Sequence, residues 1–159
     1  MTALGWAAAA LLASPAPAAE PSSLTAWHGS WVGEGEAFGQ PATATLEIAA
    51  GEGGAATLAY RLSIARTPPL TYSAEATYAV DAKGRVSGKW TDSTGRARAV
   101  AGGVNAAKWW THWGSADVEI GRSTYVLEEG RRLLVSDSVL QEDGGWRVFA
   151  VLRYTRKKP

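Results

Sequence analysis

The chain has 159 residues, which is enough for one domain with a sizeable core and too few for two ordinary domains. Sixteen Lys and Arg balance fifteen Asp and Glu, which excludes a strong field of one sign that would attract nucleic acid or acidic lipid. Cysteine is absent, and this excludes disulfides, thiolate nucleophiles, Cys metal sites and lipid-modified Cys anchors. We therefore expect a globular domain without a nucleic-acid partner.

The first residues have the pattern of a secretory leader. An apolar run at 3–13 is too short to span a bilayer, and Ala16-Pro17-Ala18 follows it as a small-x-small cleavage site. No Lys or Arg precedes the run, so the alternative is that the true start lies elsewhere. We expect a signal peptide at 1–18 with cleavage after Ala18, a linker at 19–28 and one domain at 29–159, in the periplasm or the medium.

Short β-rich runs fill the rest of the chain and are separated by turn residues. Three of the breaks end in glycine, which adopts a positive φ without strain: 81–84, 92–95 and 142–145. Connections this short are typical of hairpins, so neighbouring strands run antiparallel. We predict strands at 30–38, 42–49, 55–65, 72–80, 85–92, 96–103, 107–113, 121–128, 132–140 and 146–156.

Ten hairpin-linked strands must protect their edges, and closing the sheet removes the edges. The prediction is an all-β fold, an antiparallel up-and-down β-barrel of about ten strands. Along most strands an apolar face alternates with one that carries Glu, Arg, Lys and Thr. A membrane barrel needs the opposite arrangement, with the apolar face outside, so we expect no membrane insertion. The expected state is a monomer or weak dimer.

Aromatic residues mark the expected interior of the barrel. Seven of the eight Trp lie outside the leader, against only two Phe in the whole chain. Trp needs both burial and a partner for its N–H group, so this excess favours a cavity wall or stacking platform; simple filling of a β core is the alternative. A barrel of ten strands is wide enough for a small ligand. The candidate residues lining the barrel interior are Tyr60, Tyr72, Tyr78, Trp90, Trp109, Trp113 and Tyr125.

The first predicted strand opens with Gly29-Ser30-Trp31, and Gly33 and Gly35 follow. This Gly-x-Trp start resembles that of the calycin group, which includes lipocalins, fatty-acid-binding proteins and nitrobindins. The longer pattern is most similar to nitrobindin-like domains and to uncharacterised Trp-rich bacterial export proteins of that superfamily. The resemblance implies that Trp31 plugs the closed end of the barrel beneath a basic side chain from the last strand. Arg153 is the candidate for that side chain, with Arg147 and Arg156 as alternatives.

The resemblance does not extend to haem. Nitrobindins bind haem through a His near the final strands, and residues 131–159 contain no His. His28 and His112 are the only histidines, and neither lies at the family's ligand position. We therefore expect no haem, no other cofactor and no metal site.

Catalytic motifs are weak throughout the chain. His112, Ser136 and Asp137 could be combined into a Ser-His-Asp set, but no Gly-x-Ser-x-Gly motif supports it. Asp137 shares the face of Leu133 and Val135, which would place it inside the barrel unless a bulge shifts the register. No catalytic residue is assigned, and the prediction leans against an enzyme.

Three functions remain open. The leading one is an exported binder of a small apolar or aromatic molecule held inside the barrel. A carbohydrate or cell-envelope-binding module would use an exposed strip of Trp109, Trp110 and Trp113. A calycin-type isomerase or hydrolase is the third.

Overall fold

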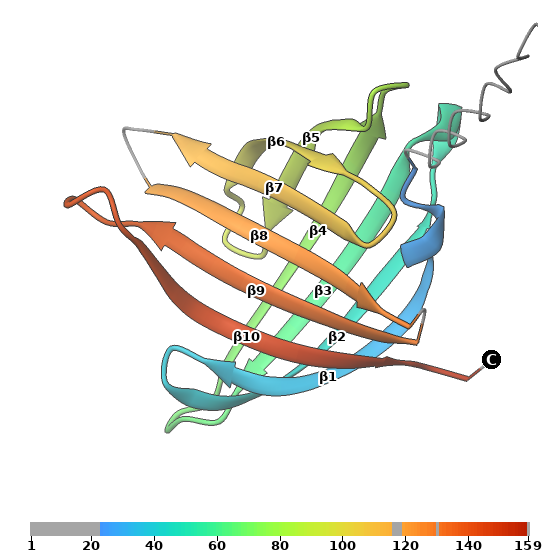
Figure 1. Cartoon of the computed structure of the whole chain (residues 1–159). Coiled ribbons are helices and arrows are strands. Elements are labelled where there is room, and N and C mark those ends of the chain that lie inside the picture. Colours follow the sequence, from blue (N-terminus) through green and yellow to red (C-terminus); the bar gives the residue numbers. More distant parts are fainter. Residues whose placement is uncertain (1–22, 116–118, 130, 159) are drawn as a thin grey trace, which may run out of the picture.

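The computed structural model describes residues 23–115, 119–129 and 131–158. Ten strands follow a single short 3-10 helix, η1 (Thr25–Trp27), and a second such helix, η2 (Glu52–Gly54), lies between two of them (Figure 1). All ten strands lie where the sequence predicts them, and their ends differ from the predicted ends by at most two residues. The strands are β1 (Gly29–Ala37), β2 (Gln40–Ala50), β3 (Ala56–Ile64), β4 (Leu70–Val80), β5 (Arg85–Asp92), β6 (Ala97–Val104), β7 (Lys108–Ser115), β8 (Glu119–Glu128), β9 (Arg132–Leu140) and β10 (Trp146–Arg156).

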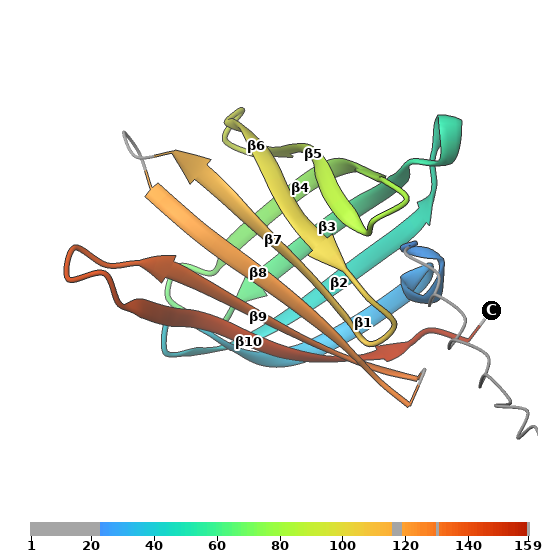
Figure 2. The ribbon, with the colours of Figure 1, turned by 45° about the horizontal axis from the view of Figure 1, so that its top comes forward.

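The strands form one closed antiparallel barrel. Each strand pairs with its neighbours in sequence, and β1 also pairs with β10 to close the sheet. The turned view shows the same arrangement, with β1 and β10 side by side (Figure 2). The prediction of an all-β, up-and-down barrel of ten strands is therefore confirmed, and its closure is compatible with a calycin-like fold.

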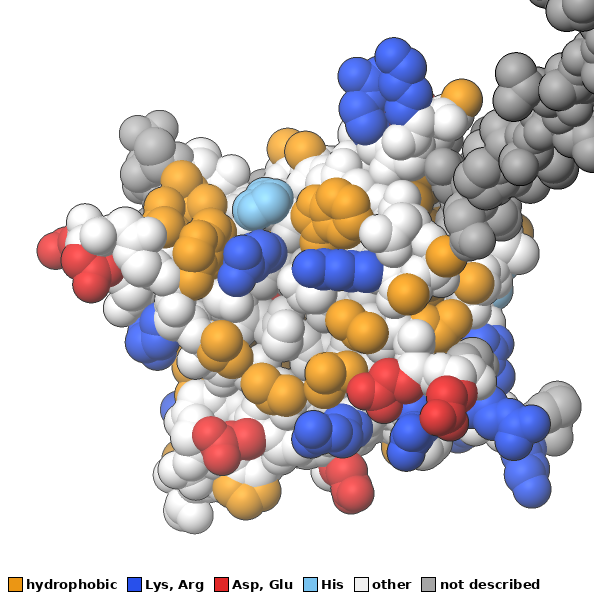
Figure 3. All heavy atoms as spheres, in the orientation of Figure 1, with side chains coloured by type: hydrophobic (Ala, Val, Ile, Leu, Met, Phe, Trp, Pro, Cys, Tyr) orange, Lys and Arg blue, Asp and Glu red, His pale blue; other side chains and the backbone are white. Residues whose placement is uncertain are grey.

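The alternation of side chains follows the predicted pattern. In β2, Ala42, Ala44, Leu46 and Ile48 are buried while the residues between them are exposed. On the outer face seen in Figure 3, hydrophobic side chains form small groups separated by charged ones. Period-two alternation places one set of side chains inside the barrel and the other outside. The sequence pattern thus sets the two faces of the sheet.

The N-terminal segment contributes to the barrel. The predicted leader 1–18 and its cleavage site lie outside the described residues, as do residues 19–22 of the expected linker. Residues 23–28 were expected to be linker, but Leu24 and Trp27 are 3% and 1% exposed. Burial of these two apolar side chains holds the segment against one end of the barrel. Within the described residues, no helix is long and apolar enough to cross a membrane.

The two ends of the barrel differ. At the end where β1 begins and β10 finishes, η1 lies across the opening, and we call this the closed end (Figures 1 and 2). Trp27, Trp31, Tyr78 and Trp109 fill it, each no more than 1% exposed. At the other end, which holds the β1–β2, β5–β6 and β9–β10 turns, the interior is hollow. We call this the open end.

A basic side chain covers Trp31 at the closed end, as the calycin resemblance implies, but it is not that of Arg153. The guanidinium of Arg156 lies 4.3 Å from the centre of the Trp31 ring. Arg156 also donates hydrogen bonds to the carbonyl oxygens of Ala26 and His28. Arg153 lies opposite Glu34 in the register of β1 and β10 and faces outward, because its neighbours Leu152 and Tyr154 point inward. The assignment of Arg153 is thus corrected to Arg156.

Candidate functional site

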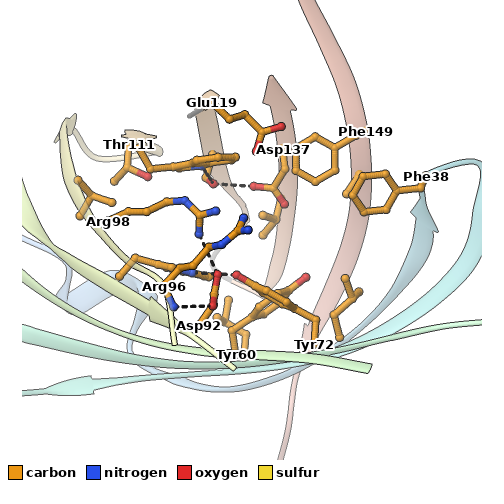
Figure 4. A pocket seen from close by; sticks show the side chains of 18 of the residues that line it. Phe38, Tyr60, Tyr72, Asp92, Arg96, Arg98, Thr111, Glu119, Asp137 and Phe149 are labelled. Atoms are coloured by element: carbon orange, nitrogen blue, oxygen red, sulfur yellow. Dashed lines mark hydrogen bonds and ion pairs between the residues drawn. The ribbon is translucent and has the colours of Figure 1, made fainter. Parts of the chain in front are cut away.

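The open end of the barrel contains a cavity of about 330 Å³. This volume lies near the lower limit for small-molecule sites, which span roughly 300–1,000 Å³. Figure 4 shows that its walls come from strands all around the barrel, with aromatic rings facing the interior. Eight aromatic side chains line it: Phe38, Tyr60, Tyr72, Trp90, Trp113, Tyr125, Phe149 and Tyr154.

Five of the seven predicted lining residues meet at this cavity: Tyr60, Tyr72, Trp90, Trp113 and Tyr125. The other two, Tyr78 and Trp109, also point inward but lie beneath it at the closed end. Alternation along a strand determines which face a side chain occupies, but it does not determine its depth along the barrel axis. Sequence reasoning therefore found the inner face without separating the lining from the plug.

An aromatic cluster forms the floor of the cavity. The Trp109 and Tyr125 rings are stacked, with centres 4.2 Å apart and planes at 16°. Tyr78 and Trp27 meet Trp109 edge-on, at 4.9 Å and 6.5 Å. Tyr125 also lines the cavity, so this cluster separates the hollow half from the filled half. Edge-to-face and offset contacts are the preferred arrangements of aromatic rings.

Hydrogen bonds hold the rings of the cavity wall in place. The indole N–H of Trp90 donates to the Tyr72 hydroxyl at 3.0 Å. Tyr60 lies within 6.1 Å of both of these rings, centre to centre. The indole N–H of Trp113 donates to the Ser123 hydroxyl at 3.1 Å. These contacts fix the orientation of the rings, so the wall is largely preformed.

Glycine supports the position of Trp113. Gly121 is its cross-strand partner, and the Trp113 ring lies where a Cβ at residue 121 would be. A larger residue there would displace the ring from the wall. Gly33 stands in the same relation to Tyr154 across β1 and β10. The rings of Trp113 and Tyr154 thus pack directly against the backbone of Gly121 and Gly33, where any other residue would place a Cβ atom.

A charged cluster lies at the mouth of the cavity. Arg98 forms an ion pair with Asp92 at 2.9 Å, and its guanidinium lies 5.6 Å from the centre of the Trp113 ring. Asp92 is 7% exposed and also accepts hydrogen bonds from Thr94 and from the backbone N–H of Arg96. Burial acts to raise the pKa of Asp92, but these hydrogen bonds outweigh it and leave the pKa below its ordinary value. Asp92 is therefore an ionised, fully engaged group.

Asp137 is a second acidic residue, placed deeper in the wall. Its Oδ1 accepts a hydrogen bond of 2.6 Å from the Ser123 hydroxyl, the same hydroxyl that accepts from Trp113. Burial raises the pKa of Asp137 to about 6, although the bond from Ser123 lowers it in part. This inward position agrees with the face that Asp137 shares with Leu133 and Val135.

The phenol groups of the interior remain neutral at ordinary pH. Burial is the main cause that raises the pKa of Tyr60, Tyr72, Tyr125 and Tyr154 above the ordinary value. The buried Tyr154 hydroxyl lies near that of Tyr60, and their interaction contributes to the pKa shifts of both groups.

The residues of the other predicted sites do not come together. Trp109 is fully buried, Trp113 lines the cavity and Trp110 alternates with them on the outer face, so the three do not form one strip. His112 is exposed and lies 5.9 Å from the Trp146 ring, centre to centre. Asp137 faces inward, away from His112, so the Ser-His-Asp set does not form. No metal-binding group of three His, Cys, Asp or Glu occurs in the described part of the chain.

Sequence reasoning missed the polar half of this site. Asp92 shares the face of Val86 and Trp90, and Ser123 that of Tyr125, so alternation could have placed both inside. The same alternation places Arg98 with Val100, Thr111 with Trp109, and Tyr154 with Leu152. Other missed lining residues have no comparable signal, because they lie in turns, at a strand end or at the β10 bulge: Phe38, Arg96, Glu119 and Phe149.

Comparison with protein-family models gives no match, and comparison with curated proteins gives no significant match. The likeness to calycins therefore depends on the barrel and on the opening motif, and assignment to a family remains a proposal.

Proposed function

We propose that this protein is an exported binding protein that holds a small apolar or aromatic molecule in the open end of its barrel. The observation that carries the proposal is the cavity of about 330 Å³ with eight aromatic rings in its walls. Aromatic and apolar walls with a few placed polar groups are typical of small-molecule sites. The fixed rings support binding, because little side-chain freedom remains to be lost when a ligand enters.

Membership of the calycin superfamily, near the Trp-rich bacterial export domains, belongs to the same proposal. The barrel closure, the Gly-x-Trp opening at Gly29 and the basic side chain of Arg156 over Trp31 support it. The leader pattern at 1–18 supports a periplasmic or secreted location. We retain a monomer or weak dimer as the expected state.

Of the alternative functions, the isomerase or hydrolase has one specific observation in its favour. Asp137 has a pKa raised to about 6 inside an apolar cavity, and such carboxyl groups are suited to general acid or base catalysis near neutral pH. The carbohydrate-binding module has less support, because its proposed stacking residues face different sides of the sheet.

Native mass spectrometry after incubation with cell extract tests the proposal. We expect a small apolar or aromatic molecule to co-purify with the protein. Val135→Phe fills the cavity and should abolish this binding, whereas Val32→Phe makes the same change on the outer face and should not. Equal binding to both variants, or no bound molecule, would contradict a site inside the barrel. A new product that disappears with Asp137→Asn would favour the enzyme instead.

A further inference from the structure

Asp137 is a carboxylate without a cationic partner inside an aromatic cavity. None of the ion pairs between described residues involves it. Its Oδ1 is bound by Ser123, and Oδ2 has no hydrogen-bond donor among the described residues. Figure 4 shows the carboxyl group directed toward the space enclosed by the rings. Burial of an unpaired charge is costly, so this position favours a ligand that supplies the missing donor.

The protein's own cations do not fill this role. Arg98 is engaged by Asp92, and Arg96, which also lines the cavity, forms no ion pair with Asp137 in the structure. Glu119, another acidic residue of the lining, forms no ion pair with a described residue and adds negative charge to the same side of the mouth. An anionic ligand would therefore bring like charge toward Asp137.

The walls around Asp137 suit a cation as well. The lining includes the rings of Tyr60 and Trp113, and such rings attract cations through their negative faces. The Ser123 hydroxyl holds Oδ1 in place, so the carboxylate is already oriented before a ligand arrives. A preformed acceptor of this kind strengthens a charge-assisted hydrogen bond.

We propose that the ligand is an organic ammonium, in which an apolar or aromatic body carries one protonated primary or secondary amine. The amine donates to Asp137 Oδ2, and the body lies among the aromatic rings of the cavity. This inference rests on the proposed binding function and specifies the chemistry of the ligand.

Three probes with one aromatic body test the inference: 1-naphthaleneethylamine, 1-naphthaleneethanol and 1-naphthaleneacetic acid. Isothermal titration at pH 7.5 and low salt measures each Kd for the full protein, for Asp137→Asn and for Glu47→Gln. Glu47→Gln removes the same charge from the outer face of β2 and controls for the overall field. Asp137→Asn removes an uncompensated buried charge, so we expect it to fold.

We expect the amine to bind at least about tenfold more tightly than the alcohol, as one charge-assisted hydrogen bond predicts. Asp137→Asn should bring the amine to the Kd of the alcohol and leave the alcohol unchanged, while Glu47→Gln keeps the difference. If amine and alcohol bind alike, or the acid binds most tightly, the inference is overturned and the proposed function stands. If no probe binds, both are overturned.

The difference in Kd between the amine and the alcohol should also depend on pH. The titratable side chains that share the cavity with Asp137 are Tyr60, Tyr72, Asp92, Arg96, Arg98, Glu119, Tyr125 and Tyr154. The phenols remain neutral and Asp92 remains ionised, so between pH 7.5 and pH 5 the main change is protonation of Asp137. At pH 5 the advantage of the amine over the alcohol should shrink. An advantage that stays the same at both values would contradict a bond to this carboxylate.

Discussion

The closed and open ends of the barrel use the same residue types in opposite ways. At the closed end, the indole N–H groups of Trp27 and Trp109 are buried without a partner among the described residues. At the open end, those of Trp90 and Trp113 each donate a hydrogen bond to a side chain. Of the closed-end indoles, only that of Trp31 donates a hydrogen bond, to the Trp27 carbonyl oxygen at 3.0 Å, and the other two are held by packing. Both indoles that surround the cavity use a hydrogen bond to a side chain, which keeps their orientation.

The buried charges differ between the two ends as well. The open end contains Asp92, Arg98 and Asp137 in or near its wall, while the fully buried side chains of the closed end are almost all apolar. Polar groups in an apolar interior lower stability unless they are satisfied, and they are common at functional sites. We infer that the closed end provides most of the stability and that the open end provides the function.

The largest expected effect comes from Trp109 in the floor cluster. Trp109→Ala leaves a void among rings that cannot collapse, and should lower the free energy of unfolding by about 3–5 kcal/mol. Trp113→Ala is the matched change at the open end, and should cost only about 1–2 kcal/mol because its ring already borders a cavity. Urea unfolding followed by circular dichroism measures both. Equal losses would remove the distinction between the ends.

The second-largest effect is expected at Asp137, where substitution should raise the free energy of unfolding and not lower it. Its pKa rises from 3.8 to about 6 on folding, so the folded state binds more protons between these values. The contribution of Asp137 to the free energy of unfolding is therefore fully present below pH 3.8, where the carboxyl group is protonated, and is lost as the pH rises through about 6. Asp137→Asn should therefore raise the free energy of unfolding at pH 7.5 by on the order of 1–3 kcal/mol. Urea unfolding between pH 4 and pH 8 measures this.

In the Asp137→Asn variant, the decline in stability across that pH window should largely disappear. Glu47→Gln, which changes an exposed carboxylate, should leave the decline in place. A variant that is no more stable than the original protein at pH 7.5 would show that the carboxylate is compensated in the folded state.

Arg156 should show the smallest of the three effects. Arg156→Ala removes the contact with Trp31 and the hydrogen bonds to two backbone carbonyls, at a cost of about 1–2 kcal/mol. Arg153→Ala changes an exposed residue opposite Glu34, and should alter stability by less than about 0.5 kcal/mol. Thermal unfolding of the two variants compares them. A larger loss of stability in Arg153→Ala than in Arg156→Ala would indicate that Arg153 stabilises the closed end.

The sequence determines most of the barrel. The turns at 81–84, 92–95 and 142–145 contain glycines with positive φ, and these glycines set where the flanking strands stop. Alternation then places Leu58 and Leu62 inside and Arg61 outside. Both signals are local, which explains why all ten strands could be predicted from the sequence.

The site is less predictable because it depends on the register between strands. Trp109 and Trp113 lie on the same face of β7, yet one belongs to the floor and the other to the wall. Asp92 and Arg98 meet only because the β5–β6 turn ends at the mouth. Among the polar residues of the site, Asp137 is the only one whose inward position was predicted from the sequence, from the face that it shares with Leu133 and Val135.

The pairing of β1 with β10 also affects how the chain folds. Trp31 and Arg156 are cross-strand partners, so the residues that seal the closed end come from opposite ends of the domain. Contacts between residues so distant in sequence form slowly, and the nine hairpins between consecutive strands can form before they do. Until β10 is in place, β1 and β9 each present an unpaired edge to other chains. The edges of β1 and β9 are therefore the parts of the barrel most prone to pair with another chain during folding. The risk ends when β10 pairs with both strands and Arg156 stacks on Trp31.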